Sequence, residues 1–376
     1  MDTGHLSFSR PPLSGADDDL TVLRLIRSRR VGPSTYHRLV AEHGSARAAL
    51  DALPAIAAAA GIMDYEACPE DVAAAELAAG RKVGARLIRC DSPLYPPALQ
   101  EIDGAPPVLW VRGDPAWLTR DPVAVIGARN SSSLGLRMAR GMAAGLGEAG
   151  HTVVAGLARG IDTAAHNAAL PTGTIAVMAG GVDVIYPAEN VVLAAQIAEK
   201  GALLSEQPPG TEPQARHFPT RNRIVSGLSL AVVVIEAAHR SGTLITAKNA
   251  LDQGREVMAV PGHPMDARAG GCNQLIRDGA VLVRNSGDVC AALGRTGDAA
   301  PRAAPGTGLP PGPAPESIQP VEVEARILSR LGPSPCDEND VIRDLGLPAA
   351  TASAAILSLE LQGRLLRVPG GRLALG

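Results

Sequence analysis

One stretch indicates the architecture of the central part of the chain: Val154-Ala-Gly-Leu-Ala-Arg-Gly-Ile-Asp-Thr-Ala-Ala-His-Asn-Ala-Ala-Leu170. The run is typical of the end of a buried strand, a loop between two glycines, and an alanine-rich helix that Asp162 and Thr163 would cap. Free backbone N–H groups at a helix start, beside the loop arginine Arg159, favour binding of an anion such as phosphate. An ordinary strand-to-helix turn would contain the same glycines, so the neighbouring loops have to decide between the two interpretations.

Apolar runs alternate with helical patterns from residue 121 onward. The candidate strands are 123–126, 151–154, 174–178, 202–204, 230–235, 256–260 and 281–283. Continuous apolar strands separated by helices predict an α/β fold, an extended Rossmann-like doubly wound sheet of parallel strands covered on both faces. Ligands of such sheets bind beyond the carboxyl ends of the strands, which is where the loop at Arg159 would lie.

Further modules are expected on both sides of this sheet. We expect a disordered N-terminus (1–17), a helical domain of the SAM or helix-hairpin-helix type (18–82), the Rossmann-like domain (83–296) with an extended lead-in at 86–113, a Pro/Gly-rich linker (297–320), and a winged-helix-like domain of three helices and a hairpin (321–376). The third of these helices, 349–361, contains no Lys or Arg. This favours a protein-interaction or regulatory role for the C-terminal domain over DNA reading.

Composition limits the classes of partner. The 376 residues carry a net charge of −3, so any anion site must be a local concentration of Lys and Arg. Five scattered cysteines form no CxxC pair and no Cys/His cluster with metal spacing, which favours reduced thiols. No apolar run is long enough to cross a membrane. The sequence therefore predicts a soluble cytoplasmic protein without a metal, a cofactor or a membrane partner.

Several predicted loops at one edge of the sheet carry hydrogen-bond donors and cations. Residues 216–223 hold three arginines, and no Asp or Glu occurs between Pro213 and Ile235, which favours anion binding over a salt-bridged surface. Phe218, within this cluster, is either a packing residue or a platform for a stacked base. The predicted nucleic-acid-binding residues are Gly127, Arg129, Ser132, Gly156, Arg159, Gly160, Phe218, Arg221, Asn222, Arg223, Ser241, Gly242 and Thr243. No residue is expected to be catalytic.

A series of motifs resembles the DprA (Smf) family of DNA-processing proteins over about residues 95–283. In order they are Gly127-Ala-Arg129, Gly156-Leu-Ala-Arg-Gly-Ile-Asp162 with His166, Tyr186-Pro187 with Asn190, Ser205-Glu206, Phe218-Pro-Thr-Arg-Asn-Arg223, Glu236, Ser241-Gly-Thr-Leu-Ile-Thr-Ala247, Gly254-Arg255, Pro261-Gly262 and Asn273-Gln-Leu-Ile-Arg-Asp-Gly279. The resemblance implies a Rossmann domain that binds and protects single-stranded DNA, helps to load the recombinase RecA during natural transformation, and forms a homodimer. Ala128 and Leu134 stand where the family usually has Ser and Tyr.

A nucleotide phosphoribohydrolase-like enzyme on a related Rossmann fold is the alternative function. Such enzymes resemble this sheet but use a Pro-Gly-Gly-x-Gly-Thr-x-x-Glu loop with a catalytic glutamate. The comparable segment here, 240–246, has no acid at that position. Asp162 and His166 lie four residues apart at a helix start, where a cap and a packed histidine are the simpler interpretation. We therefore expect a non-enzymatic DNA-binding protein.

Overall fold

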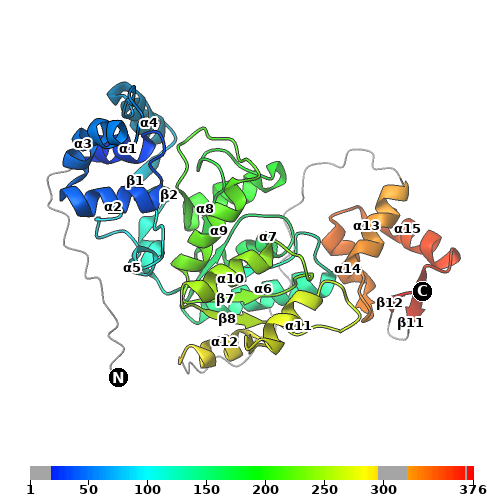
Figure 1. Ribbon diagram of the computed structural model, residues 1–376. Coiled ribbons are helices and arrows are strands. Elements are labelled where there is room, and N and C mark those ends of the chain that lie inside the picture. Colours follow the sequence, from blue (N-terminus) through cyan, green and yellow to red (C-terminus); the bar gives the residue numbers. More distant parts are fainter. Residues whose placement is uncertain (1–17, 295–319, 369–370) are drawn as a thin grey trace, which may run out of the picture.

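The computed structural model describes residues 18–294, 320–368 and 371–376. The predicted disordered N-terminus and all but the last residue of the predicted linker lie outside these ranges. Figure 1 shows a central α/β domain with an N-terminal helical domain on one side and a C-terminal domain on the other. The α/β class and the two flanking domains are as the sequence predicts.

The N-terminal domain is a group of short helices. These are α1 (Asp19–Arg27), α2 (Pro33–His43), α3 (Ala46–Ala59) and α4 (Glu70–Lys82). The Asp18 side chain accepts a hydrogen bond from the Thr21 N–H and so caps α1. Pro33 occupies the first position of α2, where its missing N–H costs nothing. Each helix turns one apolar face inward, so the group closes around a common core.

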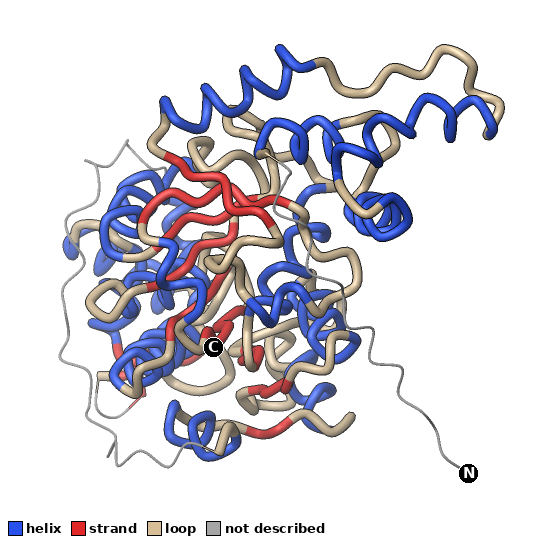
Figure 2. Tube along the Cα trace, turned by 90° about the vertical axis from the view of Figure 1, so that its left-hand side faces the viewer, coloured by secondary structure: helices blue, strands red, loops and turns tan. Residues whose placement is uncertain are grey.

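The central sheet has nine strands in the order β1-β2-β6-β5-β4-β3-β7-β8-β9. Their bounds are β1 (Ala85–Arg89), β2 (Val108–Gly113), β3 (Pro122–Ile126), β4 (Thr152–Ala155), β5 (Thr174–Val177), β6 (Ala202–Ser205), β7 (Ala231–Val234), β8 (Glu256–Ala259) and β9 (Val281–Leu282). Across the part of the sheet with the order β6-β5-β4-β3-β7-β8-β9, all neighbouring strands are parallel. Figure 2 shows the twisted strands at the centre of this domain with helices around them.

The lead-in predicted at 86–113 is extended where the sequence indicated, and its two extended stretches are strands of the central sheet. This segment contains β1 and β2, which pair antiparallel with each other, and β2 pairs antiparallel with β6. Pairing with the sheet buries Val108 to Val111, which would otherwise be exposed to water. The sheet is therefore mixed rather than wholly parallel.

Helices cover both faces of the sheet. They are α5 (Pro97–Gln100), α6 (Ser133–Glu148), α7 (Ile161–Ala169), α8 (Val191–Lys200), α9 (His217–Leu228), α10 (Thr243–Asp252), α11 (Gly270–Arg277) and α12 (Ser286–Ala292), with 3-10 turns at Pro115–Thr119 and Ala188–Asn190. Successive residues of β3 point to opposite faces: Val123 and Val125 join one apolar cluster, and Ala124 and Ile126 join the other. The sheet is thus doubly wound, as predicted.

The C-terminal domain has the winged-helix organisation. It comprises α13 (Pro320–Arg330), β10 (Cys336–Asp337), α14 (Glu338–Leu345), α15 (Ala349–Leu361), β11 (Leu365–Val368) and β12 (Arg372–Leu375). Its strands form a separate three-stranded sheet, and its helices bury a separate apolar cluster. The five cysteines of the chain are all free and buried. Within the described ranges, no helix combines the length and apolar character that crossing a bilayer requires.

Candidate functional site

The loops after β3 and β4 are packed directly against each other. The Ile161 N–H donates to the Ala128 carbonyl oxygen at 3.2 Å. Gly160 has a φ of +77°, and a Cβ built on it would lie 2.4 Å from that same oxygen. Only glycine tolerates both this dihedral and this close approach. The two loops that the sequence assigned to one sheet edge are therefore brought together.

The carboxylate of Asp162 binds the loop after β4 from the inside. It accepts hydrogen bonds from the backbone N–H groups of Gly156 (2.9 Å) and Ala158 (3.2 Å). The predicted capping of α7 by Asp162 and Thr163 is wrong, because the helix begins after Gly160 without a side-chain cap and Thr163 donates to the Ala158 carbonyl. An internal carboxylate thus takes two of the donors that the sequence offered to phosphate.

A second internal carboxylate lies at the start of α6. Ser132 caps this helix as predicted, accepting from the Gly135 N–H at 2.9 Å. Its own N–H and hydroxyl both donate to the carboxylate of Glu236, the residue that follows β7 by two positions. Burial raises the pKa of Glu236, and the hydrogen bonds from Ser132 oppose that rise. The predicted phosphate donors of Ser132 are therefore engaged by a protein anion.

Arg221 has a structural position beneath the loop after β4. Its side chain is buried and donates from Nη2 to the Gly156 carbonyl at 3.0 Å. A Cβ on Gly156 would lie 1.6 Å from the other guanidinium nitrogen, so any larger residue here would displace the buried guanidinium. Burial lowers the pKa of Arg221 and raises that of Asp162, and the opposite charges of the two groups counteract both shifts.

The 216–223 cluster is not without a local acid, which corrects the premise drawn from the sequence. Arg223 donates from Nη2 to the Glu206 carboxylate at 2.5 Å, and both side chains are mostly buried. Glu206 directly follows β6, so the pairing depends on the order of strands in the sheet. Asn222, between Arg221 and Arg223, is half-buried, and Arg216 at the start of α9 is exposed.

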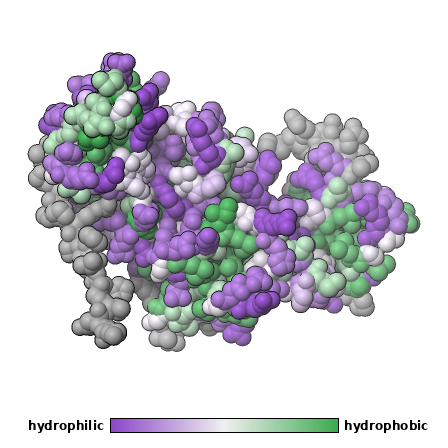
Figure 3. Space-filling model, in the orientation of Figure 1, coloured by the Kyte–Doolittle hydropathy of each residue, from purple (hydrophilic) through white to green (hydrophobic). Residues whose placement is uncertain are grey.

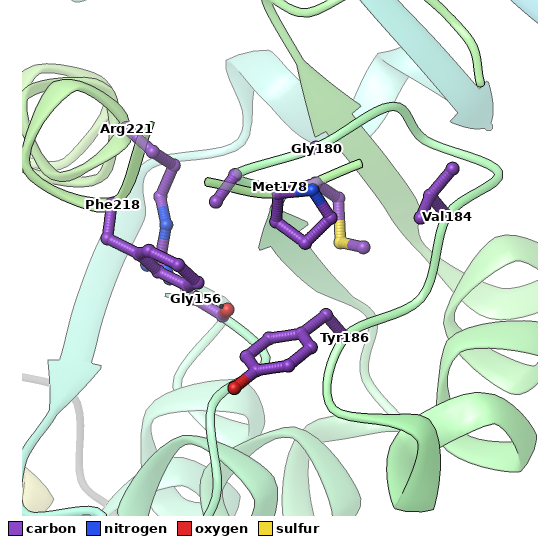
Figure 4. A pocket seen from close by; sticks show the side chains of 9 residues that line it. Gly156, Met178, Gly180, Val184, Tyr186, Phe218 and Arg221 are labelled. Atoms are coloured by element: carbon purple, nitrogen blue, oxygen red, sulfur yellow. Dashed lines mark hydrogen bonds between the residues drawn. The ribbon is translucent and has the colours of Figure 1, made fainter. Parts of the chain in front are cut away.

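An exposed rim remains at the mouth of a small hollow. Arg129 is exposed, and its guanidinium carbon lies 5.3 Å from the ring centroid of Phe218. Phe218 meets Tyr186 edge to face, with ring centroids 5.8 Å apart. Figure 4 shows the rings of Phe218 and Tyr186 on either side of Gly156, with Met178 also lining the hollow. We name Arg129, Phe218 and Tyr186 the aromatic rim.

Tyr186 is the member of the rim that the predicted binding set lacks. It is a large hydrophobic side chain with 54% of its surface exposed. The signal available in the sequence was the Tyr186-Pro187 motif, in a chain with only 2% aromatic residues. An exposed ring beside a cation suits a stacked base next to a phosphate.

The remaining predicted residues flank this rim. Arg159 is exposed and pairs with Glu189, its Nε lying 3.0 Å from the carboxylate. At the start of α10, the Ser241 hydroxyl accepts from the Thr243 N–H, and the Thr243 hydroxyl donates to the Gly127 carbonyl at 3.1 Å. Gly242, between them, is exposed. The structure thus joins the loops after β3, β4 and β7 at one edge.

His166, the candidate for acid/base chemistry, is part of the core. It is fully buried, and its Nδ1 lies 2.8 Å from the Thr174 hydroxyl. Burial lowers the pKa of His166 to about 3, so the ring is neutral. In the part of the chain that the structure describes, no three His, Cys, Asp or Glu side chains converge to hold a metal ion.

Family comparisons cover all three domains. Residues 86–294 match the family described as DNA recombination-mediator protein A. Residues 16–79 match the DprA-like N-terminal HHH domain, and residues 310–371 match the DprA winged helix domain.

Individual proteins of known sequence are also similar to this chain. The chain is 43% identical over 216 residues to the DNA processing protein DprA of Bacillus subtilis, covering 57% of this chain and 73% of that protein. It is 39% identical over 289 residues to the protein Smf of Escherichia coli, covering 76% of each chain.

Two solved structures are also similar. The Streptococcus pneumoniae DprA structure superposes with a TM-score of 0.55 and 36% identity, covering 64% of this chain and 92% of that one. The Helicobacter pylori DprA structure gives structural insights into the single-stranded DNA binding mode of that protein. It superposes with a TM-score of 0.52 and 28% identity, covering 56% of this chain and 95% of that one.

Proposed function

Since the chain belongs to the DNA recombination-mediator protein A family, also known as DprA or Smf, we propose that it binds single-stranded DNA at the joined loops after β3, β4 and β7. The bound strand would be protected and handed to the recombinase RecA during natural transformation. The single-stranded DNA binding of the Helicobacter pylori relative supports this proposal.

The aromatic rim is the observation that carries the proposal. An exposed cation stacked on one ring, with a second ring beside it, offers a phosphate contact and base-stacking surfaces at the same place. Every base has a flat face, so stacking tolerates any sequence, whereas duplex DNA keeps its bases stacked on each other. Binding should therefore favour single strands and show little sequence preference.

The backbone N–H groups of the loops bind internal carboxylates, which leaves the contacts with DNA phosphates to the side chains. Asp162 and Glu236 hold the loops in place, and outward side chains such as Arg129 and Arg159 contact the phosphates. Arg159 would exchange Glu189 for a phosphate, a small loss because both partners are largely exposed. Gly242, at the exposed start of α10, allows close approach of the strand.

We also propose that the protein is a homodimer through its central domain. β9 is the last strand of the sheet, and its Val281 and Leu282 are 38% and 46% exposed. An exposed apolar edge strand is a surface that a second copy can cover. Sedimentation of the wild type and of Leu282→Asp tests this, since the substitution should shift a dimer to monomer.

A binding titration tests the DNA proposal. Single-stranded and double-stranded oligonucleotides of equal length are titrated across a range of salt concentrations. We expect tighter binding to the single strand, with the logarithm of affinity falling linearly with the logarithm of salt concentration as counterions are released. Equal affinity for the two forms, or binding that salt does not weaken, would refute the proposal.

Substitutions in the rim then locate the site. Arg129→Ala removes a charge-assisted contact worth about 1.5–3 kcal/mol, and Phe218→Ala removes stacking worth about 1–3 kcal/mol per base. The control is Arg81→Ala, an exposed arginine at the end of α4 on the helical domain. If Arg129→Ala folds normally but binds as tightly as the control, the rim is not the site.

A further inference from the structure

The winged-helix domain is docked on the central domain through charged side chains. On the central side are Arg137 and Arg140 of α6, and on the other side are Asp340 and Asp344 of α14. Arg137 lies 2.8 Å from the Asp340 carboxylate, and Arg140 lies 3.1 Å from that of Asp344. In Figure 3, hydrophilic residues gather where the two domains meet.

A second set of contacts reaches the loop that holds Arg129. Arg330, at the end of α13, donates to the carbonyl of Ser131 at 2.8 Å. From the central side, Arg268 donates to the carbonyls of Ser329 (2.8 Å) and Leu331 (2.7 Å). The docked domain therefore abuts the loop between β3 and α6, two residues from Arg129.

The two arginines that pair with α14 lie close in the chain to Arg129 of the rim. Arg137 and Arg140 lie in the first two turns of α6, which begins at Ser133 directly after the Arg129 loop. At 1.5 Å per residue they lie about 6 Å and about 10 Å along the helix axis from its start. A strand that contacts Arg129 could therefore run on along this face of α6, if α14 were absent.

From this arrangement we propose that Arg137 and Arg140 form a second single-stranded DNA-binding surface, and that the acidic face of α14 covers it. The inference rests on the proposed binding of single-stranded DNA at the rim. Asp340 and Asp344 take the positions of two phosphates, so DNA and the winged-helix domain compete for the same arginines. Release of the domain extends the DNA-binding path from Arg129 along α6.

Two features weaken the contact between the winged-helix domain and α6. The side chain of Asp344 is fully buried, yet within the described residues no donor reaches its second carboxylate oxygen. An unsatisfied buried acceptor lowers the net stability of the contact. The pair of Arg137 with Asp340 leaves the arginine 56% exposed, so salt and phosphate have access to it.

The test uses the full chain with Asp340→Asn and Asp344→Asn together. We expect single-stranded DNA to bind about three- to tenfold more tightly, because the substitutions free Arg137 and Arg140 from their carboxylate partners. The matched control is Glu338→Gln, because this acid lies on the same helix but pairs with Arg367 inside the winged-helix domain. The control should bind like the wild type.

Adding Arg137→Ala and Arg140→Ala to the double Asn variant should abolish the gain. A gain that persists without these arginines would overturn the proposed surface. Small-angle scattering measures docking independently of DNA. The compact scattering profile should be lost in the variant with Asp340→Arg and Asp344→Arg, because like charges then face each other. It should return when Arg137→Asp and Arg140→Asp are added, because opposite charges are paired again.

The outcomes separate the two proposals. If neither the wild type nor any variant binds single-stranded DNA, the proposed function fails. If the wild type binds and the double Asn variant binds equally, while scattering shows the domain released, the covered surface fails and the proposed function stands.

Discussion

The two flanking domains differ in how they are attached to the central sheet. The N-terminal helices share one continuous apolar cluster with it, from Val22 and Leu23 of α1 through Trp110 of β2 to Val232 of β7. The winged-helix domain buries a cluster of its own. Within the described residues, Leu134 is the one apolar side chain of the central domain packed against that cluster.

Their polar contacts differ in the same way. Glu76 of α4 is 8% exposed and accepts from Arg27 of α1 (2.8 Å) and from the indole N–H of Trp110 (2.9 Å), which ties two helices to the sheet. At the other end, the contact of Arg137 with Asp340 is half-exposed. Apolar burial is not screened by salt, whereas exposed ion pairs are. The N-terminal domain therefore shares the apolar core of the sheet, whereas the C-terminal domain is attached mainly through polar contacts, which is consistent with its proposed release.

Truncating Trp110 should break the shared core with the largest effect. Trp110 is 1% exposed and lies between the helical domain and the sheet, so Trp110→Ala should lower the free energy of unfolding by about 3–5 kcal/mol. Chemical denaturation followed by circular dichroism measures this. Leu361→Ala, at a position 82% exposed on α15, should change it by less than about 0.5 kcal/mol. Comparable losses for the two variants would contradict the burial of Trp110 in the core shared by the helical domain and the sheet.

Acid should weaken the central domain before it weakens the winged helix. The pKa of His166 is about 3 when folded and near 6.5 when unfolded, so the unfolded chain binds more protons between these values. Stability is therefore complete above pH 6.5 and falls as pH decreases, by about 2 kcal/mol at pH 5. Residues 321–376 contain no histidine and lack this source of acid sensitivity.

His166→Gln isolates this contribution by comparison with the wild type. The raised pKa values of Asp162 and Glu236 act in the opposite sense, because their protonated forms are favoured in the folded state. The variant should lose less stability than the wild type between pH 6.5 and pH 5. Parallel stability profiles over this range would show that the ring is not buried in its neutral form.

Removing the winged-helix domain should have the smallest effect on stability. A chain ending near residue 296 loses the ion pairs to α14, the hydrogen bonds of Arg268 and Arg330 and the contact of Leu134. The free energy of unfolding of the central domain should fall by less than the loss expected for Trp110→Ala, because these contacts are mainly polar and partly exposed. Its affinity for single-stranded DNA should exceed that of the full chain, because the truncation uncovers Arg137 and Arg140. Lost DNA binding with an intact thermal transition would instead identify the winged helix as the DNA-binding element.

The sequence by itself determined the elements and the family. The candidate strands from 123 to 283 correspond to β3 through β9, because apolar runs and glycine-bounded turns are local signals. The motifs around Arg129, Arg159 and Phe218 identified the relatives. The loops were assigned to one sheet edge correctly, since parallel strands place their carboxyl ends together.

Only the tertiary structure decided what each charged residue does. Asp162 and Arg221 look like a cap and a phosphate ligand, yet both hold the loop after β4 from the inside. Arg223 looked unpaired until strand order brought Glu206 to it. Hydrogen-bond and ion-pair partners that are distant in the chain produce no local sequence pattern from which they could be predicted. The strength of an ion pair also depends on burial, which packing of the whole chain sets.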